Sequence, residues 1–317
     1  MKDNEKLLLR IMIWIFFAIL FLFFPFFAPN KFIVHVAIVG LSFAVLAASW
    51  DLLFGYAGQI SFGHAGFYGV GAYTSALLAH HIGVSPWIGL FLGSFAAAIL
   101  GALIGIPSLR IRGIYLALTT LAFAEVIRII ATNWHSVTRG TLGLSAKPYP
   151  GIEFHTTNYY YLMLTLSVIS VGIMFWIANY SKVGLIFRAI KADEIRCQSL
   201  GIDILRYKLI AFAISGFFAG LAGAFSAHYL RLINPGDLAP HITIFAVAMA
   251  VIGGTSTIIG PALAAIIIHG LMEYLKVLGA VYSLMAVGAV LILFVIFLPS
   301  GIAGHMPRKW IGLPETK

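Results

Sequence analysis

Long apolar runs recur along nearly the whole chain, from Ile11 to Leu298, and they limit its fold more than any other feature. A helix needs about 20 apolar residues to cross a bilayer, and most of these runs approach that length. Only 10% of the 317 residues are charged, whereas soluble domains carry about 25%. The runs are continuously apolar rather than alternating, which argues against a β-barrel. The sequence therefore predicts an all-α, polytopic membrane protein.

We expect about ten transmembrane helices in a single integral membrane domain that covers residues 1–317. Lys2, Lys6 and Arg10 precede the first run, and no small-x-small cleavage site follows it. This run is therefore predicted to be an uncleaved helix whose N-terminus is cytoplasmic. The approximate spans are 11–28, 32–53, 64–82, 86–106, 114–131, 159–178, 209–230, 241–259, 260–277 and 282–298.

The distribution of positive charge supports ten spans. With that number, most of the twenty Lys and Arg residues fall on the cytoplasmic side, as the positive-inside rule expects. An odd number would place one basic cluster outside, so both termini are predicted to be cytoplasmic. Five spans precede the polar outer loop 132–158 and five follow it. The two halves then have opposite orientations, as in transporters built from an inverted 5+5 repeat.

The stretch Gly55–Tyr73, GYAGQISFGHAGFYGVGAY, interrupts the apolar pattern with repeated glycines. Each glycine weakens a helix by roughly 1 kcal/mol relative to alanine, so a break or a close helix approach is predicted. A phosphate-binding loop is excluded, because G-x-x-x-x-G-K-[ST] occurs nowhere in the chain. The polar side chains either face a path through the bundle or hold the break together, and both interpretations stay open. The candidate residues are Asp51, Gly55, Gly58, Gln59, Ser61, Phe62, Gly63, His64 and Gly66.

The most hydrophilic segment, residues 179–208, is predicted to contain one short amphipathic helix. Apolar residues recur along one helical face and charged residues occupy the other, and Gly201 is the expected C-terminal stop. The helix either lies on anionic lipid headgroups or docks onto a cytoplasmic partner. Asp193 and Glu194 would be repelled by a lipid surface, yet composition alone leaves both alternatives open.

Two charged residues within a predicted span, Glu125 and Arg128, lie three positions apart on one helical face. Ionisable groups in a bilayer are costly, so they mark either a functional path or a paired structural site. We expect a structural ion pair here. Neither G-x-S-x-G nor H-E-x-x-H occurs, and His80 and His81 have no ligand-like partner, so no enzyme chemistry and no metal site are predicted.

Three motifs occur in order along the chain. They are GYAGQISFGHAGFYGVGAYTSALL from Gly55, RAIKADEIRCQSLGID from Arg188, and the pairs GG at 253–254 and GP at 260–261. Together they resemble the LivM-type permeases of branched-chain amino acid ABC transporters, over about residues 41–301. The sequence departs from the common pattern of that family at Cys197 and Gln198, where small residues are usual, and at Ser256 and Ala264, where glycine is common.

This resemblance implies that the segment from Arg188 to Gly201 is the cytoplasmic coupling segment, which engages an ATPase subunit. It therefore favours the docking interpretation of the amphipathic helix. The residues assigned to coupling are Arg188, Ala189, Lys191, Asp193, Glu194, Leu200 and Gly201. The further candidates for a broken-helix translocation path are Gly253, Gly254, Gly260 and Pro261.

The function that the resemblance implies is import of branched-chain or similar amino acids across a bacterial inner membrane. The implied partners are a second, homologous permease in a heterodimer, two ABC ATPase subunits and a periplasmic substrate-binding protein, with the loop 132–158 in the periplasm. The ATPases would use the ATP, so the chain is expected to be no enzyme, to bind no cofactor and no nucleic acid, and to contact the lipid bilayer. Alternatives are a permease for urea, short amides or sugars, and an ion-coupled secondary transporter, which would not need the docking helix.

Overall fold

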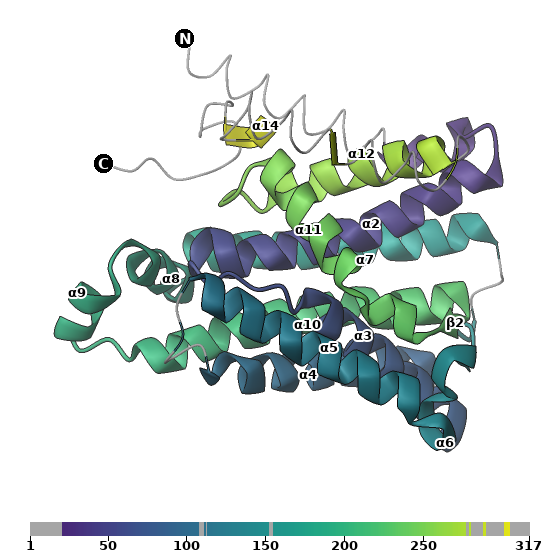
Figure 1. Cartoon of the computed structure of the whole chain (residues 1–317). Helices are drawn as coiled ribbons and strands as arrows, with labels where there is room; N and C mark the ends of the chain where they lie inside the picture. The colour runs from purple at the N-terminus through teal and green to yellow at the C-terminus, as the bar shows by residue number, and fades with distance from the viewer. Residues whose placement is uncertain are drawn as a thin grey trace, which may run out of the picture.

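The computed structural model describes residues 21–107, 111, 113–151, 155–276, 279, 288–289 and 301–304. Within these residues the chain is a bundle of helices whose long members run roughly side by side (Figure 1). The elements are α2 (Lys31–Asp51), η1 (Leu52–Tyr56), α3 (His64–Leu77), η2 (Leu78–Ile82), α4 (Pro86–Gly105), α5 (Ile114–Asn133), α6 (His135–Thr138), η4 (Gly140–Leu142), β1 (Leu144–Ser145), α7 (Thr156–Tyr180), α8 (Lys182–Ala192), α9 (Glu194–Ser199), α10 (Ile204–Leu230), β2 (Leu232–Ile233), η5 (Pro235–Leu238), α11 (Pro240–Gly253), α12 (Ile259–Lys276) and α14 (Gly301–Gly304).

Six helices of the described chain are long and apolar enough to cross a membrane: Lys31–Tyr56, which combines α2 and η1, and α4, α5, α7, α10 and α12. They correspond to the predicted spans 32–53, 86–106, 114–131, 159–178, 209–230 and 260–277, with ends that differ by a few residues. The predicted all-helical, polytopic class is confirmed at this level. The predicted spans 11–28 and 282–298 lie mostly outside the described residues, so ten spans, cytoplasmic termini and an inverted repeat stay predictions.

The predicted span 241–259 is wrong in its second part. Helix α11 ends at Gly253, and an irregular loop leads from Gly254, with φ of 101°, to the start of α12 at Ile259. The 14 residues of α11 extend about 21 Å, which is less than the roughly 30 Å of a hydrocarbon core. The helix stops early because the loop turns its backbone N–H groups towards a buried carboxylate, as described below.

The second half of the glycine-rich stretch lies in α3 and serves close packing. A Cβ at Gly71 would overlap the backbone of Gly220 in α10, and a Cβ at Gly93 of α4 would overlap the carbonyl of Gly71. Helices in an apolar solvent associate through such close backbone contacts. The predicted close approach is therefore found in α3, while the break lies before it, between Tyr56 and His64.

The two ends of the bundle differ. Helices α8 and α9 project beyond one end, and α6 and β2 lie at the opposite end (Figure 1). There β1 pairs with β2 in an antiparallel sheet of two residues each, Leu144 with Ile233 and Ser145 with Leu232. The predicted polar loop 132–158 thus supplies α6, η4 and β1 to the end of the bundle farthest from α8.

Candidate functional site

Asp51, the last residue of α2, is fully buried, and the backbone of a distant loop holds its carboxylate. The N–H of Ser256 donates to Oδ1 at 2.7 Å, and the N–H groups of Thr257 and Ile258 donate to Oδ2 at 3.1 and 2.9 Å. Positive φ angles at Ser256 (67°) and Ile258 (59°) accompany this arrangement. A concave array of backbone N–H groups binds anions, and here it offsets the cost of burying the charge.

Gly55 lies one turn after Asp51 and touches the same loop. A Cβ at this position would overlap the Asp51 carboxylate and lie 2.7 Å from the Ser256 nitrogen, so only glycine fits. The helix ends at Tyr56, which leaves the Gly55 carbonyl without a partner in the helix. The hydroxyl of Ser256 donates to that carbonyl at 2.7 Å.

Lys191, in the last turn of α8, reaches the same carbonyl from the cytoplasmic segment predicted by the sequence. Its ammonium donates to the Gly55 oxygen at 2.5 Å and to the Ser256 hydroxyl at 3.1 Å, and it lies 5.9 Å from the centre of the Phe54 ring. Burial lowers the pKa of Lys191, and the nearby Asp51 carboxylate opposes that shift. This ammonium therefore connects α8 both to the helix end at Gly55 and to the loop.

We call this set of contacts the Asp51 junction; its residues are Asp51, Gly55, Lys191, Ser256, Thr257 and Ile258. It joins three segments that are far apart in the sequence: the end of α2, the end of α8, and the loop between α11 and α12. The sequence suggests Asp51, Gly55 and Lys191 for two separate roles, and the structure brings the three together.

The polar groups of the break, residues 57–63, mainly hold its backbone in place. The Trp50 indole donates to the Ser61 carbonyl at 2.8 Å, the Ser61 hydroxyl accepts from the Gly63 N–H at 3.1 Å, and the Phe62 N–H donates to the Thr120 hydroxyl at 2.9 Å. The last of these contacts ties the break to α5. A role of Ser61, Phe62 and Gly63 in a translocation path stays a prediction.

Four further candidates flank the break. His64 is fully buried, with Nε2 at 2.8 Å from the Ser215 hydroxyl, and Gly66 packs against Ala124 of α5. Gly58 has a φ of 71° and lies against the Lys191 side chain. The Gln59 side chain donates to the Ala57 carbonyl at 3.2 Å. The same residue also lines a cavity.

That cavity lies between the break and the start of the coupling segment. It has a volume of about 420 Å³ and is open to the surface. The residues that line it are Phe54, Ala57, Gly58, Gln59, Ile60, Ile190, Lys191, Ala192, Asp193, Glu194 and Ile195. A movement of the α8–α9 connection relative to the break would change the shape of this cavity.

The prediction of one amphipathic helix in the coupling segment is wrong, because two helices meet at Asp193. Helix α8 ends at Ala192, Asp193 takes an extended conformation with φ of −161°, and its carboxylate accepts the Arg196 N–H at 3.0 Å. Aspartate is a favoured N-cap, so it begins α9 rather than continuing α8. The side chain that we expected on an exposed helix face serves to redirect the chain.

Glu194 forms an ion pair within the chain, with its Oε1 at 2.6 Å from Nζ of the buried Lys208. Leu200, by contrast, is 79% exposed at the far end of α9, and Gly201 takes the φ of 77° that a helix stop requires. Arg188 and Ala189 lie on α8, and the Arg188 Nε is buried without a hydrogen-bond partner among the described residues. The assignment of these residues to coupling stays a prediction.

The GG and GP pairs frame the loop of the Asp51 junction. A Cβ at Gly253 would overlap the backbone of Gly260, and the Pro261 nitrogen is 2.5 Å from that same position. The end of α11 and the start of α12 therefore cross in contact, with Gly254 turning the chain between them. This close crossing determines the position of the loop residues Ser256, Thr257 and Ile258.

Sequence reasoning missed Thr257 and Ile258, since they act through backbone N–H groups that any residue carries. The sequence singles out Ser256 only because glycine is common at this position in the family. Its φ of 67° is a conformation that glycine adopts readily. The one signal for the site is a carboxylate at the end of a long apolar run, which requires donors from elsewhere in the chain.

A bundle of apolar helices, broken near one end and fastened there to a projecting helical arm, defines a multi-pass membrane protein of the transporter type. The chain matches the family model for the permease component of branched-chain amino acid transport systems over residues 32–295. The high-affinity branched-chain amino acid transport system permease protein LivM of Escherichia coli is 32% identical to it, over 85% of this chain and 69% of the relative. LivH of the same organism is 25% identical over 84% and 92%, and the ribose import permease protein RbsC of Haemophilus influenzae is 24% identical over 81% and 79%. No solved structure matches the chain.

This chain therefore belongs to the family of permease components of branched-chain amino acid transport systems. The family assigned from the three sequence motifs is thereby confirmed.

Proposed function

We propose that this chain is the transmembrane permease subunit of an ATP-driven ABC importer that moves branched-chain amino acids into the cytoplasm. The family, and the branched-chain amino acid transport systems of the LivM and LivH relatives, support this substrate class. The observation that carries the proposal is the Asp51 junction, because it fastens a projecting helical arm to two helix breaks in the bundle.

In this mechanism α8 and α9 contact an ATPase subunit, through exposed side chains that include Ile195 in α9 and Leu200 directly after it. When the ATPases close on ATP, the displacement of α8 passes through Lys191 to the Gly55 carbonyl and to Ser256. The end of α2 and the loop between α11 and α12 then move together. This movement would switch the path between outward and inward access.

The complete transporter in this proposal contains a second, homologous permease, two ATPase subunits and a periplasmic substrate-binding protein. The chain lies in the bacterial inner membrane with ten spans, an inverted 5+5 repeat and both termini cytoplasmic. The end of the bundle formed by α6, η4, β1 and β2 would face the periplasm, where the binding protein docks. The ATPases carry out the hydrolysis, and this chain binds no cofactor or metal of its own.

Reconstitution in proteoliposomes tests the proposal. We expect radiolabelled leucine to accumulate only when the chain, its partner permease, the ATPases, ATP and the leucine-loaded binding protein are all present. Uptake that follows a proton or sodium gradient without the ATPases would refute it in favour of a secondary transporter. The RbsC relative keeps sugar transport as a second candidate, so ribose is assayed in parallel with leucine, isoleucine, valine and urea.

A further inference from the structure

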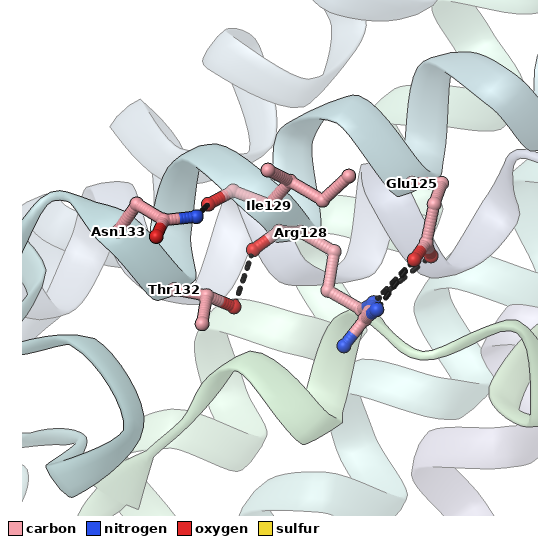
Figure 2. Close-up of polar contacts among 5 residues, drawn as sticks. All are labelled: Glu125, Arg128, Ile129, Thr132 and Asn133. Carbon is pink, nitrogen blue, oxygen red and sulfur yellow. Dashed lines mark hydrogen bonds and ion pairs between the residues drawn. The ribbon is translucent and has the colours of Figure 1, made fainter.

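The side chains of Glu125 and Arg128 in α5 form a tight ion pair (Figure 2). The Arg128 Nε donates to both carboxylate oxygens, at 3.0 and 2.9 Å, and Nη2 donates to Oε1 as well. The hydroxyl of Thr132 donates to the Arg128 carbonyl at 2.8 Å, one turn further along the helix. The expected ion pair is therefore present, and one guanidinium nitrogen points away from Glu125.

The pair lies near the middle of a helix that is long enough to span the membrane. Glu125 is eleven positions after the first residue of α5, which places it about 16 Å along the helix axis, close to half of a 30 Å hydrocarbon core. The two side chains are nevertheless 34% and 35% exposed in the chain. Charged groups that face lipid at the bilayer centre are strongly unfavourable, so this side of α5 does not face lipid.

The position of the ion pair around the axis of α5 indicates which neighbouring elements its side chains face. The helix packs against α3 and η5, and its buried residues are Leu116, Ala117, Thr120, Ala124 and Ala131. Leu121, Glu125, Arg128 and Thr132 follow one another at helical spacing along the edge of that packed face. Val126 and Ile130 point away from this edge, and both are exposed and apolar, as a lipid-facing surface would be.

This edge of α5 is also mechanically connected to the glycine break. Thr120 accepts the Phe62 N–H, and Gly66 packs against Ala124. The ion pair therefore lies within about two turns of the contact that joins α5 to residues 57–63. A movement of the break would carry the pair with it.

We propose that Glu125 and Arg128 form a site in the translocation path that binds the zwitterionic head group of an α-amino acid. The carboxylate of Glu125 matches an ammonium group, and the guanidinium of Arg128 matches a carboxylate with bidentate geometry. Without substrate the two side chains neutralise each other, and with substrate each exchanges its partner for the opposite charge of the amino acid. The proposal rests on amino acid transport by this chain, and it goes beyond the expectation of a purely structural pair.

Cysteine accessibility tests the site in the full transporter. Cys197 is the only cysteine of the chain, so Cys197→Ala removes every thiol from this subunit, whose labelling is then read after it is separated from its partners. Glu125→Cys and Leu121→Cys are probed with a membrane-impermeant cationic methanethiosulfonate in proteoliposomes, and Val126→Cys is the matched control. Leu121→Cys keeps the ion pair intact, and Val126 has the depth of Glu125 but points about 100° away around the helix.

We expect both path variants to react at least tenfold faster than Val126→Cys. Leucine supplied on its binding protein with ATP should slow the reaction of Leu121→Cys, which keeps both residues of the site. In the chain that keeps its native Cys197, Glu125→Gln should lower leucine uptake at least tenfold while the two permeases still co-purify.

Reaction no faster than that of the Val126→Cys control would overturn the proposal. Loss of co-purification in Glu125→Gln, together with an unreactive Leu121→Cys variant, would also overturn it and would instead place the pair against the second permease. Failure of the unaltered transporter to import leucine would refute the proposed function, whereas the labelling would still report whether this edge lines a path.

Discussion

The Asp51 carboxylate lies 2.7 Å from the backbone nitrogen of Ser256, although 205 positions separate the two residues in the chain. This contact joins the end of α2 to the loop between α11 and α12, and Lys191 adds α8 to the same point. Two breaks in the bundle thus share one carboxylate. A displacement at the projecting arm would reach both of them together.

Replacing Asp51 with asparagine should destabilise the fold and impair transport. The amide keeps one acceptor, but its NH2 group then faces backbone N–H donors, so at least one donor stays buried without a partner. Such a loss costs about 1–3 kcal/mol. We expect a lower thermal midpoint in detergent and at least tenfold less leucine uptake. The matched control is Asp203→Asn, since Asp203 caps α10 and asparagine caps equally well. Equal midpoints for the two variants would contradict the role of Asp51.

Gly55→Ala tests the close approach at the junction. The added methyl group would overlap the Asp51 carboxylate, which is itself fixed by three N–H donors, so the carboxylate has no room to move. We expect loss of leucine uptake even where the protein still inserts in the membrane. Gly172→Ala in α7 is the control, because a Cβ at Gly172 meets no atom within 4 Å. That variant should be as stable as the parent or up to about 1 kcal/mol more stable.

Lys191→Met should separate ATP hydrolysis from transport. Methionine retains the apolar stem but removes both donor bonds, so α8 loses its connection to Gly55 and Ser256. We expect ATPase activity in the complex to persist while leucine imported per ATP falls several-fold. Lys182→Met, at the exposed start of α8, is the control for the loss of one positive charge from the same helix. Normal coupling in Lys191→Met would refute the junction as the transmission point.

The pKa of Lys191 gives a pH dependence of defined sign. Since burial lowers its pKa in the folded chain, the folded state binds fewer protons than the unfolded state between that lowered value and the ordinary 10.5. Stability attributable to this group is therefore full above 10.5 and is lost as the pH falls through the folded value. We compare the thermal midpoints of the parent and of Lys191→Met from pH 7 to pH 10.5. The midpoint of the parent should rise relative to that of the variant as the pH rises. A parent that loses stability relative to the variant over this range would contradict the sign.

A substitution at Glu194 tests an ion pair within the chain, because its carboxylate contacts Lys208. Glu194→Gln leaves the buried Lys208 ammonium without its carboxylate, and the cost should lie below the roughly 3–5 kcal/mol typical of fully buried pairs, because Glu194 is partly exposed. We expect Glu194→Lys to be worse, since it places two ammonium groups together. The exchanged pair Glu194→Lys with Lys208→Glu should recover part of the stability in a thermal unfolding assay. No recovery would mean that Glu194 acts mainly through another contact.

Several helix bounds were predictable because they depend on local hydropathy and on proline. Pro86 starts α4 at the predicted residue, and the run 64–82 is helical throughout, as α3 followed by η2. The prediction from apolar periodicity was wrong where a single capping side chain ends one helix and begins the next. Asp193 caps α9 with its own carboxylate, and this divides a segment whose apolar spacing predicted one helix.

The Asp51 junction could not be predicted for a different reason. Its donors are backbone N–H groups of residues 256–258, and their identity carries no signal for a partner so far away in the chain. The end of α11 at Gly253 follows from the same contact, so the predicted span 241–259 failed together with it. The sequence assigns Asp51 and the GG pair to a broken-helix path and Lys191 to coupling, and neither assignment predicts that they share one site.

Ser256 separates backbone strain from hydrogen bonding at the junction. Its φ of 67° costs an L-residue about 1–2 kcal/mol, which glycine avoids, while its hydroxyl donates to the Gly55 carbonyl. Ser256→Ala loses the hydrogen bond and keeps the strain, whereas Ser256→Gly loses the bond and relieves the strain. We therefore expect the glycine variant to be more stable than the alanine variant by about 1 kcal/mol in thermal unfolding. At Ser199, the last residue of α9, the order should reverse, because alanine favours a helix over glycine. An alanine variant at position 256 that equals or exceeds the glycine variant would show that the loop does not hold its positive φ in the membrane.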